Sequence, residues 1–431
     1  MASSLSTLTE IDQQCIWHPF TQMKTAFPPI PIVEGQGLYL HAADGRKYLD
    51  GISSWWVNLH GHAHPHIINK MMSQAKTLEH VIFADFTHPP AIELAQRLLG
   101  VLPGAMAKIF YSDNGSTAVE IAIKMAIQYW RNNHSPHKVK IISFKNSYHG
   151  DTFGAMSAAG RNGFNRHFWQ HLFAVETIDP PTRGHEEHTF SQLEAILAQG
   201  NAACFIFEPL LLGSGGMISY SAAALDQLLK RCHSKGVLTI ADEVMTGFGR
   251  TDTLFACEQL HEVPDFICLS KGITGGFLPL GVTACTNKIY EAFLGDSLQQ
   301  AFLHGHSYTA NPIACSCANG SLDLLLEESC TSQRKMIAAK HTHFCAKWKE
   351  HHRLKRCESV GTILILEFFT SNTSYFNSMR DQLYQFFLDR DILLRPLGNV
   401  LYVMPPYCIT EQELEFIYLN IILTLDTHEL F

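Results

Sequence analysis

Short apolar runs alternate with stretches of helical periodicity from about residue 105 onward, and this alternation constrains the fold most. Apolar runs of this length read as strands buried on both faces, which pack into a largely parallel sheet between layers of helices. The runs are KIFYSD (108–113), VKIISF (139–144), ACFIFEP (203–209), VLTIAD (237–242), DFICLSK (265–271) and GVTACT (281–286). We therefore predict an α/β fold with a mostly parallel central sheet flanked by helices.

The two ends of the chain have a different pattern. Residues 37–59 contain short β-like pieces separated by the turn signals AADGR and LDG. Residues 312–355 have a helical pattern, and the strand-like segments GTILILEFF and NVLYVMPPY follow. We predict an N-terminal arm (1–60) and a C-terminal segment (312–431) that together form a smaller α+β domain beside a large domain (61–311).

Charge and hydropathy exclude several classes of protein. The net charge is −8, and neither Lys nor Arg forms a run that could follow a phosphate backbone, so nucleic acid is not an expected partner. No stretch reaches the ~18 apolar residues of a membrane span, and the first residues lack the pattern of a secretory signal. We expect a cytoplasmic protein with no membrane partner.

Cysteine and histidine are the residues that could indicate a metal site. The 12 cysteines are scattered without a CxxC pair, which indicates buried free thiols in a reducing compartment. His60, His62, His64 and His66 alternate within LHGHAHPHI, a pattern that fits a loop or an extended segment, and HExxH is absent. We predict no metal site. A metal-dependent hydrolase built on this segment is the alternative, and metal analysis would test it.

Polar residues follow the first apolar run. Asn114, Gly115, Ser116 and Thr117 begin a long amphipathic helix, where free backbone N–H groups and the helix dipole favour a phosphate. The same residue types also cap helices for purely structural reasons. A phosphate cradle and a simple cap both remain open at this position.

Two later runs end in charged residues. Asp242 closes VLTIAD, and a buried carboxylate needs a cationic or hydrogen-bonding partner. Lys271 closes DFICLSK, and the glycines of GITGG after it would let the backbone approach a flat ligand. Lys271 is therefore a candidate Schiff-base lysine. The alternative is a lysine whose stem is buried while its ammonium reaches the surface.

Together, these three features meet the needs of pyridoxal 5'-phosphate (PLP). One group would bind its phosphate, one its pyridine nitrogen and one its aldehyde. The carboxylate would keep the pyridine nitrogen protonated, because a nearby negative charge raises the pKa of that nitrogen. The protonated ring then accepts electrons from a substrate carbanion.

From about His18 to Pro406, the sequence resembles the class III, fold type I, PLP-dependent aminotransferases. The segments SYHGDTFGAMS, IADEVMTGFGRT, LSKGITGG and HGHSYTANPIAC occur in the order and spacing of that family. WHPFTQM, DGISSWWVNLHGHAHP, KMAIQYW, LFACE and RPLGNVLYVMPPY are similar to one branch of it. That branch converts 8-amino-7-oxononanoate to 7,8-diaminononanoate in biotin biosynthesis and draws its amine from S-adenosylmethionine.

The resemblance implies a role for each matching residue around the cofactor. Lys271 would hold PLP and move a proton between substrate and cofactor, and Asp242 would pair with the pyridine nitrogen. Tyr148 would pack over the cofactor and meet the substrate. Phosphate binding would fall to Gly115 and Ser116 and to two residues from the other subunit of a homodimer, His306 and Ser307.

Further residues match family positions around the substrate. Trp55 would form a wall of the pocket, and Arg395 would bind the substrate carboxylate, a task suited to a planar bidentate donor. A core aromatic and a surface ion pair are the respective alternatives. The remaining matches are Phe20, Asp151, a backbone contact at Gly305, Arg250 in or near the site, and Glu208 in a supporting role.

The amine donor is the open part of this prediction. Phe20 stands where the family's S-adenosylmethionine users carry Tyr, so the stacking face is kept and the hydroxyl is lost. Relatives that take the amine from lysine also read PFTQMK. The paired SSWW and the ending LYVMPPY favour S-adenosylmethionine, used in a ping-pong exchange between PLP and pyridoxamine phosphate.

Two further alternatives differ in activity. Another class III enzyme, of the ornithine or 4-aminobutyrate ω-aminotransferase type, would pair with 2-oxoglutarate. A non-catalytic PLP-fold binding protein would lack covalently bound cofactor, and the joint presence of Lys271, Asp242 and Tyr148 argues against it.

Overall fold

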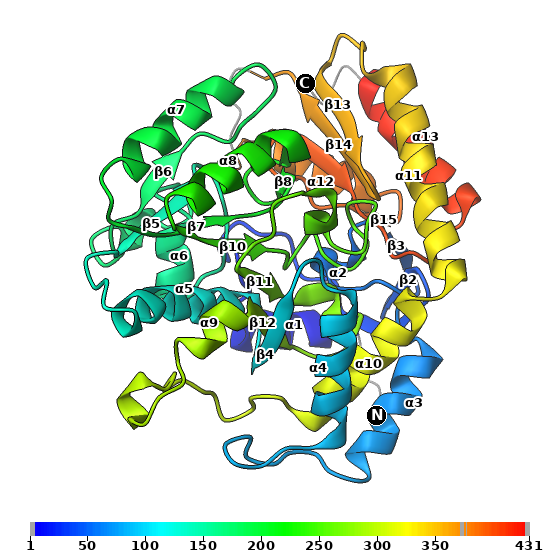
Figure 1. Cartoon of the computed structure of the whole chain (residues 1–431). Coiled ribbons are helices and arrows are strands. Elements are labelled where there is room, and N and C mark those ends of the chain that lie inside the picture. The colour runs from blue at the N-terminus through cyan, green and yellow to red at the C-terminus, as the bar shows by residue number, and fades with distance from the viewer. Residues whose placement is uncertain (1–4, 371–374, 376, 427–431) are drawn as a thin grey trace.

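A computed structural model of the chain (Figure 1) describes residues 5–370, 375 and 377–426. Its largest sheet has seven strands in the order β4-β12-β11-β10-β7-β5-β6. β12 is antiparallel to both of its neighbours, β11 and β4, and the other neighbouring pairs are parallel. The strands are β4 (Met106–Ser112), β5 (Lys140–Phe144), β6 (Glu176–Ile178), β7 (Ala202–Phe207), β10 (Leu238–Asp242), β11 (Phe266–Leu269) and β12 (Gly281–Thr286). The mostly parallel α/β sheet is confirmed.

Both faces of this sheet are covered, which explains the continuous apolar runs. Along β7, Cys204 and Ile206 pack in the cluster around α5, whereas Phe205 and Phe207 pack in the large core on the other face. The helices around the sheet are α4 (Pro89–Val101), α5 (Gly115–Asn132), α6 (Phe153–Ala158), α7 (Glu186–Leu197), α8 (Ala222–Ser234) and α9 (Asn287–Glu291). Short 3₁₀ turns occur at η1 (Arg166–Phe168), η2 (Ala256–Gln259), η3 (Lys271–Thr274) and η4 (Leu298–Gln300).

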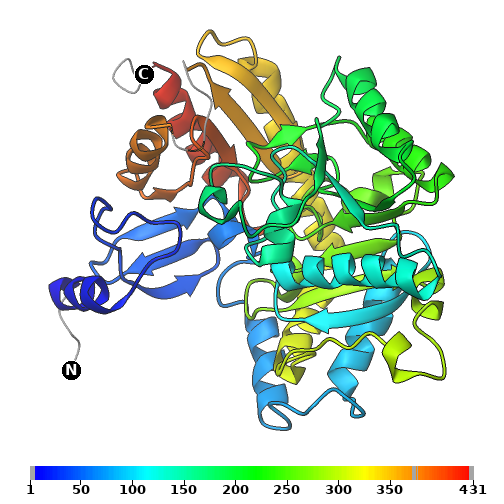
Figure 2. The same cartoon turned by 90° about the vertical axis from the view of Figure 1, so that its left-hand side faces the viewer.

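The N-terminal segment forms a second, four-stranded sheet that a C-terminal strand completes. α1 (Leu5–Cys15) comes first, and the sheet order is β1 (Ile32–Gln36), β2 (Tyr39–Ala42), β3 (Lys47–Asp50) and β15 (Ile392–Leu393). Figure 2 shows this blue sheet beside the orange and red C-terminal elements, apart from the large sheet. The predicted β-rich arm is confirmed, and its pairing with β15 joins the two ends of the chain.

The C-terminal part contains helices followed by strands, as predicted, and with β13, which was not predicted, the strands β14 and β16 form a three-stranded antiparallel sheet. These elements are α10 (Pro312–Leu325), α11 (Glu328–Trp348), β13 (Leu354–Val360), β14 (Ile363–Phe368), α12 (Met379–Leu388), β16 (Val400–Val403) and α13 (Glu411–Asp426). The helical stretch predicted to reach residue 355 ends at Trp348, and β13 begins at Leu354. The boundaries at residues 60 and 311 stay a prediction, and residues 1–4, 371–374, 376 and 427–431 of these segments lie outside the described residues.

The histidine-rich segment is a loop only as far as His64. α3 (Pro65–Ala75) begins at the next residue, because proline suits the first turn of a helix and the His64 side chain accepts from the backbone N–H of His66. The prediction of a loop or extended segment is therefore wrong at His66. Three of the imidazoles bond to Ser321, Asp50 and Asp323, and the described residues hold no group of three or more His, Cys, Asp or Glu side chains that could bind a metal.

Two other features complete the description. A short hairpin, β8 (Leu211–Leu212) and β9 (Ile218–Ser219), follows β7, and α2 (Ser53–Trp56) is a single turn after β3. No helix in the described ranges is long and apolar enough to cross a membrane.

Candidate active site

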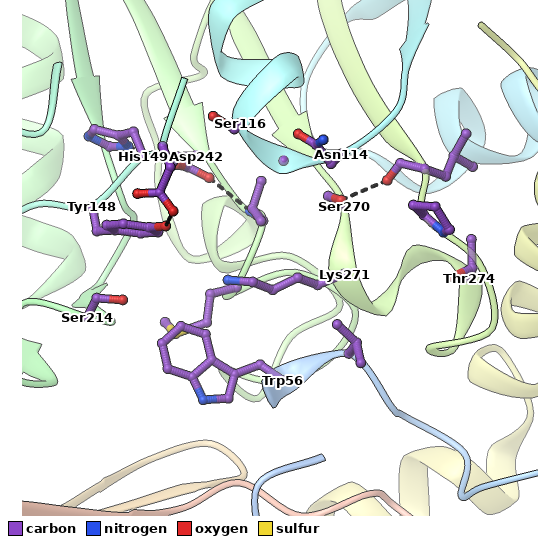
Figure 3. A pocket seen from close by; sticks show the side chains of 18 of the residues that line it. Trp56, Asn114, Ser116, Tyr148, His149, Ser214, Asp242, Ser270, Lys271 and Thr274 are labelled. Carbon is purple, nitrogen blue, oxygen red and sulfur yellow. Dashed lines mark hydrogen bonds and ion pairs between the residues drawn. The ribbon is translucent and has the colours of Figure 1, made fainter. Parts of the chain in front are cut away.

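A cavity of about 760 Å³ lies at the carboxyl ends of the central strands, the edge where open parallel sheets bind ligands. Figure 3 shows Lys271 extending into it above Trp56, with Tyr148, His149 and Asp242 on one side. Seven residues predicted from the sequence line this cavity: Gly115, Ser116, Tyr148, Asp151, Glu208, Asp242 and Lys271. Segments far apart in sequence therefore meet at one site.

Lys271 lies two residues after the end of β11 and begins η3, with a positive φ of 48°. Burial lowers the pKa of its amine to about 8, against the opposing charges of Asp242 and Glu208. Its Nζ lies 4.4 Å from the centroid of the Trp56 ring. The amine thus points into the cavity, and near neutral pH a larger fraction of it is unprotonated than in an ordinary lysine, which favours its action as a nucleophile. The alternative of a lysine that reaches the surface is not what the structure shows.

Asp242 is buried at the end of β10, and its side chain is held by two partners. Its Oδ2 lies 2.7 Å from His149 Nδ1, and its Oδ1 accepts from the backbone N–H of Val244 at 3.1 Å. The sequence predicted a cationic or hydrogen-bonding partner without identifying His149. The imidazole is itself buried, and its Nε2 has no hydrogen-bond partner in the described protein.

The first turn of α5 combines a cap with an exposed edge. Asn114 Oδ1 accepts from the backbone N–H of Thr117 at 3.0 Å, so the capping role is real. Gly115 and Ser116 also line the cavity, and a Cβ at Gly115 would lie 2.7 Å from Val244 Cγ1. Backbone N–H groups of a first helical turn lack intrahelical partners, so this edge can accept an anion.

Thr152 is a lining residue that sequence reasoning missed. Its backbone N–H donates to Ser116 Oγ at 3.0 Å, and the two hydroxyl oxygens are 2.8 Å apart. Thr152 directly follows Asp151 in the segment SYHGDTFGAMS, and this position could have indicated that it lies in the site.

Glu208 supports the loop that carries Tyr148. Its two carboxylate oxygens accept from the backbone N–H groups of Tyr148 and Gly213, each at 2.9 Å. Burial raises the pKa of Glu208 to about 7. The Tyr148 hydroxyl donates to Asp151 Oδ2 at 2.8 Å, and burial raises the pKa of that phenol well above its usual range. Tyr148 therefore remains a neutral phenol.

A second chamber of about 280 Å³ shares Trp56, Tyr148, Ser214 and Lys271 with the first. Its other walls are Phe20, Trp55, Phe164, Tyr375, Arg395, Leu397 and Tyr402. The Arg395 guanidinium carbon lies 4.6 Å from the centroid of the Trp55 ring, and the rings of Trp55 and Phe20 meet edge to face at 5.5 Å. Trp55 and Arg395 thus face a cavity rather than the core or a surface carboxylate.

Four predicted residues lie outside both chambers. Gly305 and Ser307 are exposed, and His306 Nδ1 lies 2.9 Å from Asp113 Oδ2. Arg250 is buried and donates to the backbone oxygens of Pro405 and Asn58. Its contacts join the N- and C-terminal segments, and it lines neither cavity.

The fold and the site together define a class of enzyme. The sequence profile of the class III aminotransferases matches residues 21–425, and the chain belongs to this family. It is a PLP-dependent transaminase. A solved amine transaminase from an uncultivated Pseudomonas species, in its PLP-bound form, is 28% identical with a TM-score of 0.88, over 95% of this chain and 97% of that one.

Several relatives share one more specific name. Adenosylmethionine-8-amino-7-oxononanoate aminotransferase from Synechococcus elongatus is 46% identical, over 95% of this chain and 98% of its own. The Helicobacter pylori protein of the same name is 38% identical, over 97% and 98%. The crystal structure of that enzyme from Methanocaldococcus jannaschii has a TM-score of 0.93 and 35% identity, over 98% and 99%.

The residues of the larger cavity fit PLP. Lys271 offers an amine with a pKa of about 8, Asp242 offers a fixed carboxylate, and the start of α5 offers free N–H groups. The close approach of Gly115 to Val244 leaves no room for a side chain beside that helix start. Lys271 matches the aldehyde of PLP, Asp242 its ring nitrogen and the start of α5 its phosphate.

Proposed function

We propose that the chain transfers the amino group of S-adenosylmethionine to 8-amino-7-oxononanoate, giving 7,8-diaminononanoate for biotin biosynthesis. One observation carries this proposal: Arg395 and Lys271 line the same aromatic chamber. The oxo-acid has a carboxylate at one end of a nine-carbon chain and its ketone near the other. A guanidinium suits the carboxylate, and Lys271 suits the reacting end.

The chain's own residues have separate tasks in this reaction. Lys271 would hold PLP through its amine, and once free it would move the proton at the reacting carbon, a task of the kind that adds ~10²–10⁴-fold in rate. Asp242 sets its negative charge against the ring nitrogen, and His149 fixes that carboxylate. The N–H groups of Gly115 and Ser116 bind the phosphate.

When bound, PLP would supply the group that carries the amine from the donor, released as the corresponding 2-oxo acid, to the ketone. Because donor and acceptor react at the same Lys271, they use the chamber in turn, which makes the kinetics ping-pong. Trp55, Phe20 and Arg395 bind both substrates, and Tyr148 and Asp151 close the side next to the cofactor.

The proposal includes a cytoplasmic homodimer with shared active sites. Gly305, His306 and Ser307 line neither chamber described above, and His306 Nδ1 lies 2.9 Å from Oδ2 of Asp113, two residues before α5. In the proposed dimer, these residues complete the partner's phosphate site. The free cysteines among the described residues support a reducing compartment.

Phe20 favours lysine as a second candidate donor. Its ring contacts Trp55 and Phe164, with centroids 5.5 and 6.1 Å apart, so it can stack on a ligand but offers no hydroxyl. Lysine needs no adenine contact at this position. The oxo-acid acceptor and the site residues are the same for both donors.

A half-reaction tests the proposal. The PLP-loaded protein is mixed with S-adenosylmethionine, lysine, ornithine or glutamate separately, and the absorbance of bound PLP is followed without an acceptor. We expect S-adenosylmethionine to convert bound PLP to its amine form, and 8-amino-7-oxononanoate to restore it. Conversion by lysine alone would change the donor, and conversion only by ornithine or glutamate would overturn the substrate assignment.

A further inference from the structure

Four consecutive residues that are not glycine have a left-handed backbone. We call Ser53–Trp56 the tryptophan turn; its φ angles are 53°, 44°, 69° and 75°. L-residues rarely adopt this region, and a run of four is stable only where the surrounding structure holds it. Such strained segments often occur where a fold must aim side chains at a ligand.

Asp50 is the residue that holds the tryptophan turn. Its side chain is fully buried at the end of β3. Asp50 Oδ1 accepts from the backbone N–H groups of Ile52 at 3.2 Å and Ser54 at 2.9 Å, and Oδ2 accepts from Ser54 Oγ at 2.7 Å. A single buried carboxylate therefore bonds to the entry and the interior of the turn.

His62 fixes the other side of that carboxylate. Its Nε2 lies 2.9 Å from Asp50 Oδ2, and its Nδ1 lies 3.2 Å from Asn58 Nδ2. Asn58 Oδ1 accepts from the backbone N–H of Gly61 at 2.8 Å, which orients the amide. Nδ1 of His62 is then an acceptor, so Nε2 carries the hydrogen and donates to Asp50.

The tryptophan turn presents its two indoles to different parts of the site. Trp55 lies beneath the Arg395 guanidinium at 4.6 Å, in the smaller chamber. Trp56 lies 4.4 Å from Lys271 Nζ, and its Nε1 donates to the Tyr402 hydroxyl at 3.0 Å. Asp50 is also paired with Leu393 of β15, two residues before Arg395. One junction thus sets the positions of Trp55, Trp56 and Arg395.

We propose that Asp50 and His62 are positioning residues that aim the tryptophan turn, and through it set the affinity for the substrate carboxylate. This inference rests on the proposed function. Neither residue lines the cavity of the cofactor or the chamber of Arg395. Both act through Trp55 and Trp56.

Asp50→Asn tests this role with almost no change in volume. An amide has one acceptor oxygen and one NH₂ group. If the oxygen keeps the bonds to the backbone of the turn, the NH₂ takes the place of Oδ2, and two donors, this NH₂ and the N–H of His62 Nε2, then face each other. Asp50→Asn combined with His62→Gln offers an acceptor to that NH₂ and should recover part of the loss. Asp44→Asn is the matched control, because Asp44 lies in the exposed β2–β3 turn and, among the described residues, accepts only from the backbone N–H of Arg46.

The measurements are steady-state kinetics with 8-amino-7-oxononanoate and near-ultraviolet circular dichroism of the cofactor-free proteins. For Asp50→Asn, we expect KM for the oxo-acid to rise about tenfold with kcat within about threefold, because binding remote from the reacting carbon is lost. The tryptophan dichroism should change in the same wavelength region as in Trp55→Phe, and Asp44→Asn should match the wild type in both measurements.

Unchanged KM and dichroism in Asp50→Asn would overturn the proposal, and so would a lower melting temperature with unchanged KM. If the wild-type protein does not aminate 8-amino-7-oxononanoate, the proposed function fails. The dichroism of the cofactor-free variants then decides the positioning role on its own.

Discussion

His149 Nδ1 lies 2.7 Å from Asp242 Oδ2, and both side chains are buried in the wall of the cavity that Lys271 enters. This contact and the Val244 N–H give each carboxylate oxygen a fixed partner. Asp242 is therefore oriented before any ligand binds. Preorganised charges of this kind stabilise a transition state without further rearrangement.

Asp242→Asn should lower kcat/KM by ~10²–10³-fold, because the charge that keeps the ring nitrogen protonated is removed. Asp265→Asn is the matched control, since Asp265 is also buried but precedes β11, away from the cavity. Steady-state kinetics of both variants check this. A loss of less than about threefold in Asp242→Asn would refute the assigned role.

Arg395→Ala should raise KM for 8-amino-7-oxononanoate by ~10–100-fold, the range expected for a lost hydrogen bond to a charged group. Arg395→Lys should fall between the wild type and Ala, because an ammonium keeps the charge but not the bidentate geometry. The kcat should change little. Equal KM values for all three proteins would show that the carboxylate binds elsewhere.

Phe20→Tyr should lower KM for S-adenosylmethionine by up to ~10-fold, the range of one added hydrogen bond. The matched control is Phe27→Tyr, because Phe27 is exposed and lines neither chamber of the site. The half-reaction rate at several donor concentrations is the measurement. An unchanged KM in Phe20→Tyr would mean that the donor does not contact this ring.

Glu208→Gln should change how the stability of the cofactor-free protein depends on pH. Burial raises the pKa of Glu208 in the folded protein to about 7, above the ordinary value of 4.5. Between these two pH values, the folded protein keeps the Glu208 carboxyl protonated to a greater extent than the unfolded chain does. The contribution of Glu208 to stability is therefore full below about pH 4.5 and is lost as the pH rises through 7. Gln cannot titrate.

Urea unfolding at pH 5, 6, 7 and 8 measures this effect. The free energy of unfolding of Glu208→Gln, relative to that of the wild type, should increase between pH 5 and pH 8 by up to about 3 kcal/mol. A constant difference between the two proteins across this range would contradict the raised pKa.

The large sheet and the central residues of the site could be predicted from sequence because their signals are local. Each predicted apolar run overlaps a strand, and Asp242 and Lys271 stand where two neighbouring strands end. β6 was missed because three residues give no periodic signal.

The supporting contacts could not be predicted, because folding joins segments that are distant in sequence. His149 meets Asp242 across 93 positions, and β15 pairs with β3 from the other end of the chain. The left-handed backbone of Trp55 and Trp56 has no glycine to indicate it. The roles of Gly305, His306 and Ser307 depend on a second subunit, so they stay predictions.

The most direct test of the central claim is to find the lysine that binds PLP. Borohydride reduces the C=N bond between an amine and PLP to a stable single bond, and peptide mass spectrometry then locates the added pyridoxyl phosphate. We predict stoichiometric labelling of the peptide that contains Lys271, and no labelling of this peptide in Lys271→Ala, which should also lose turnover while remaining folded. Labelling of another lysine, or none in the PLP-loaded wild type, would contradict the account.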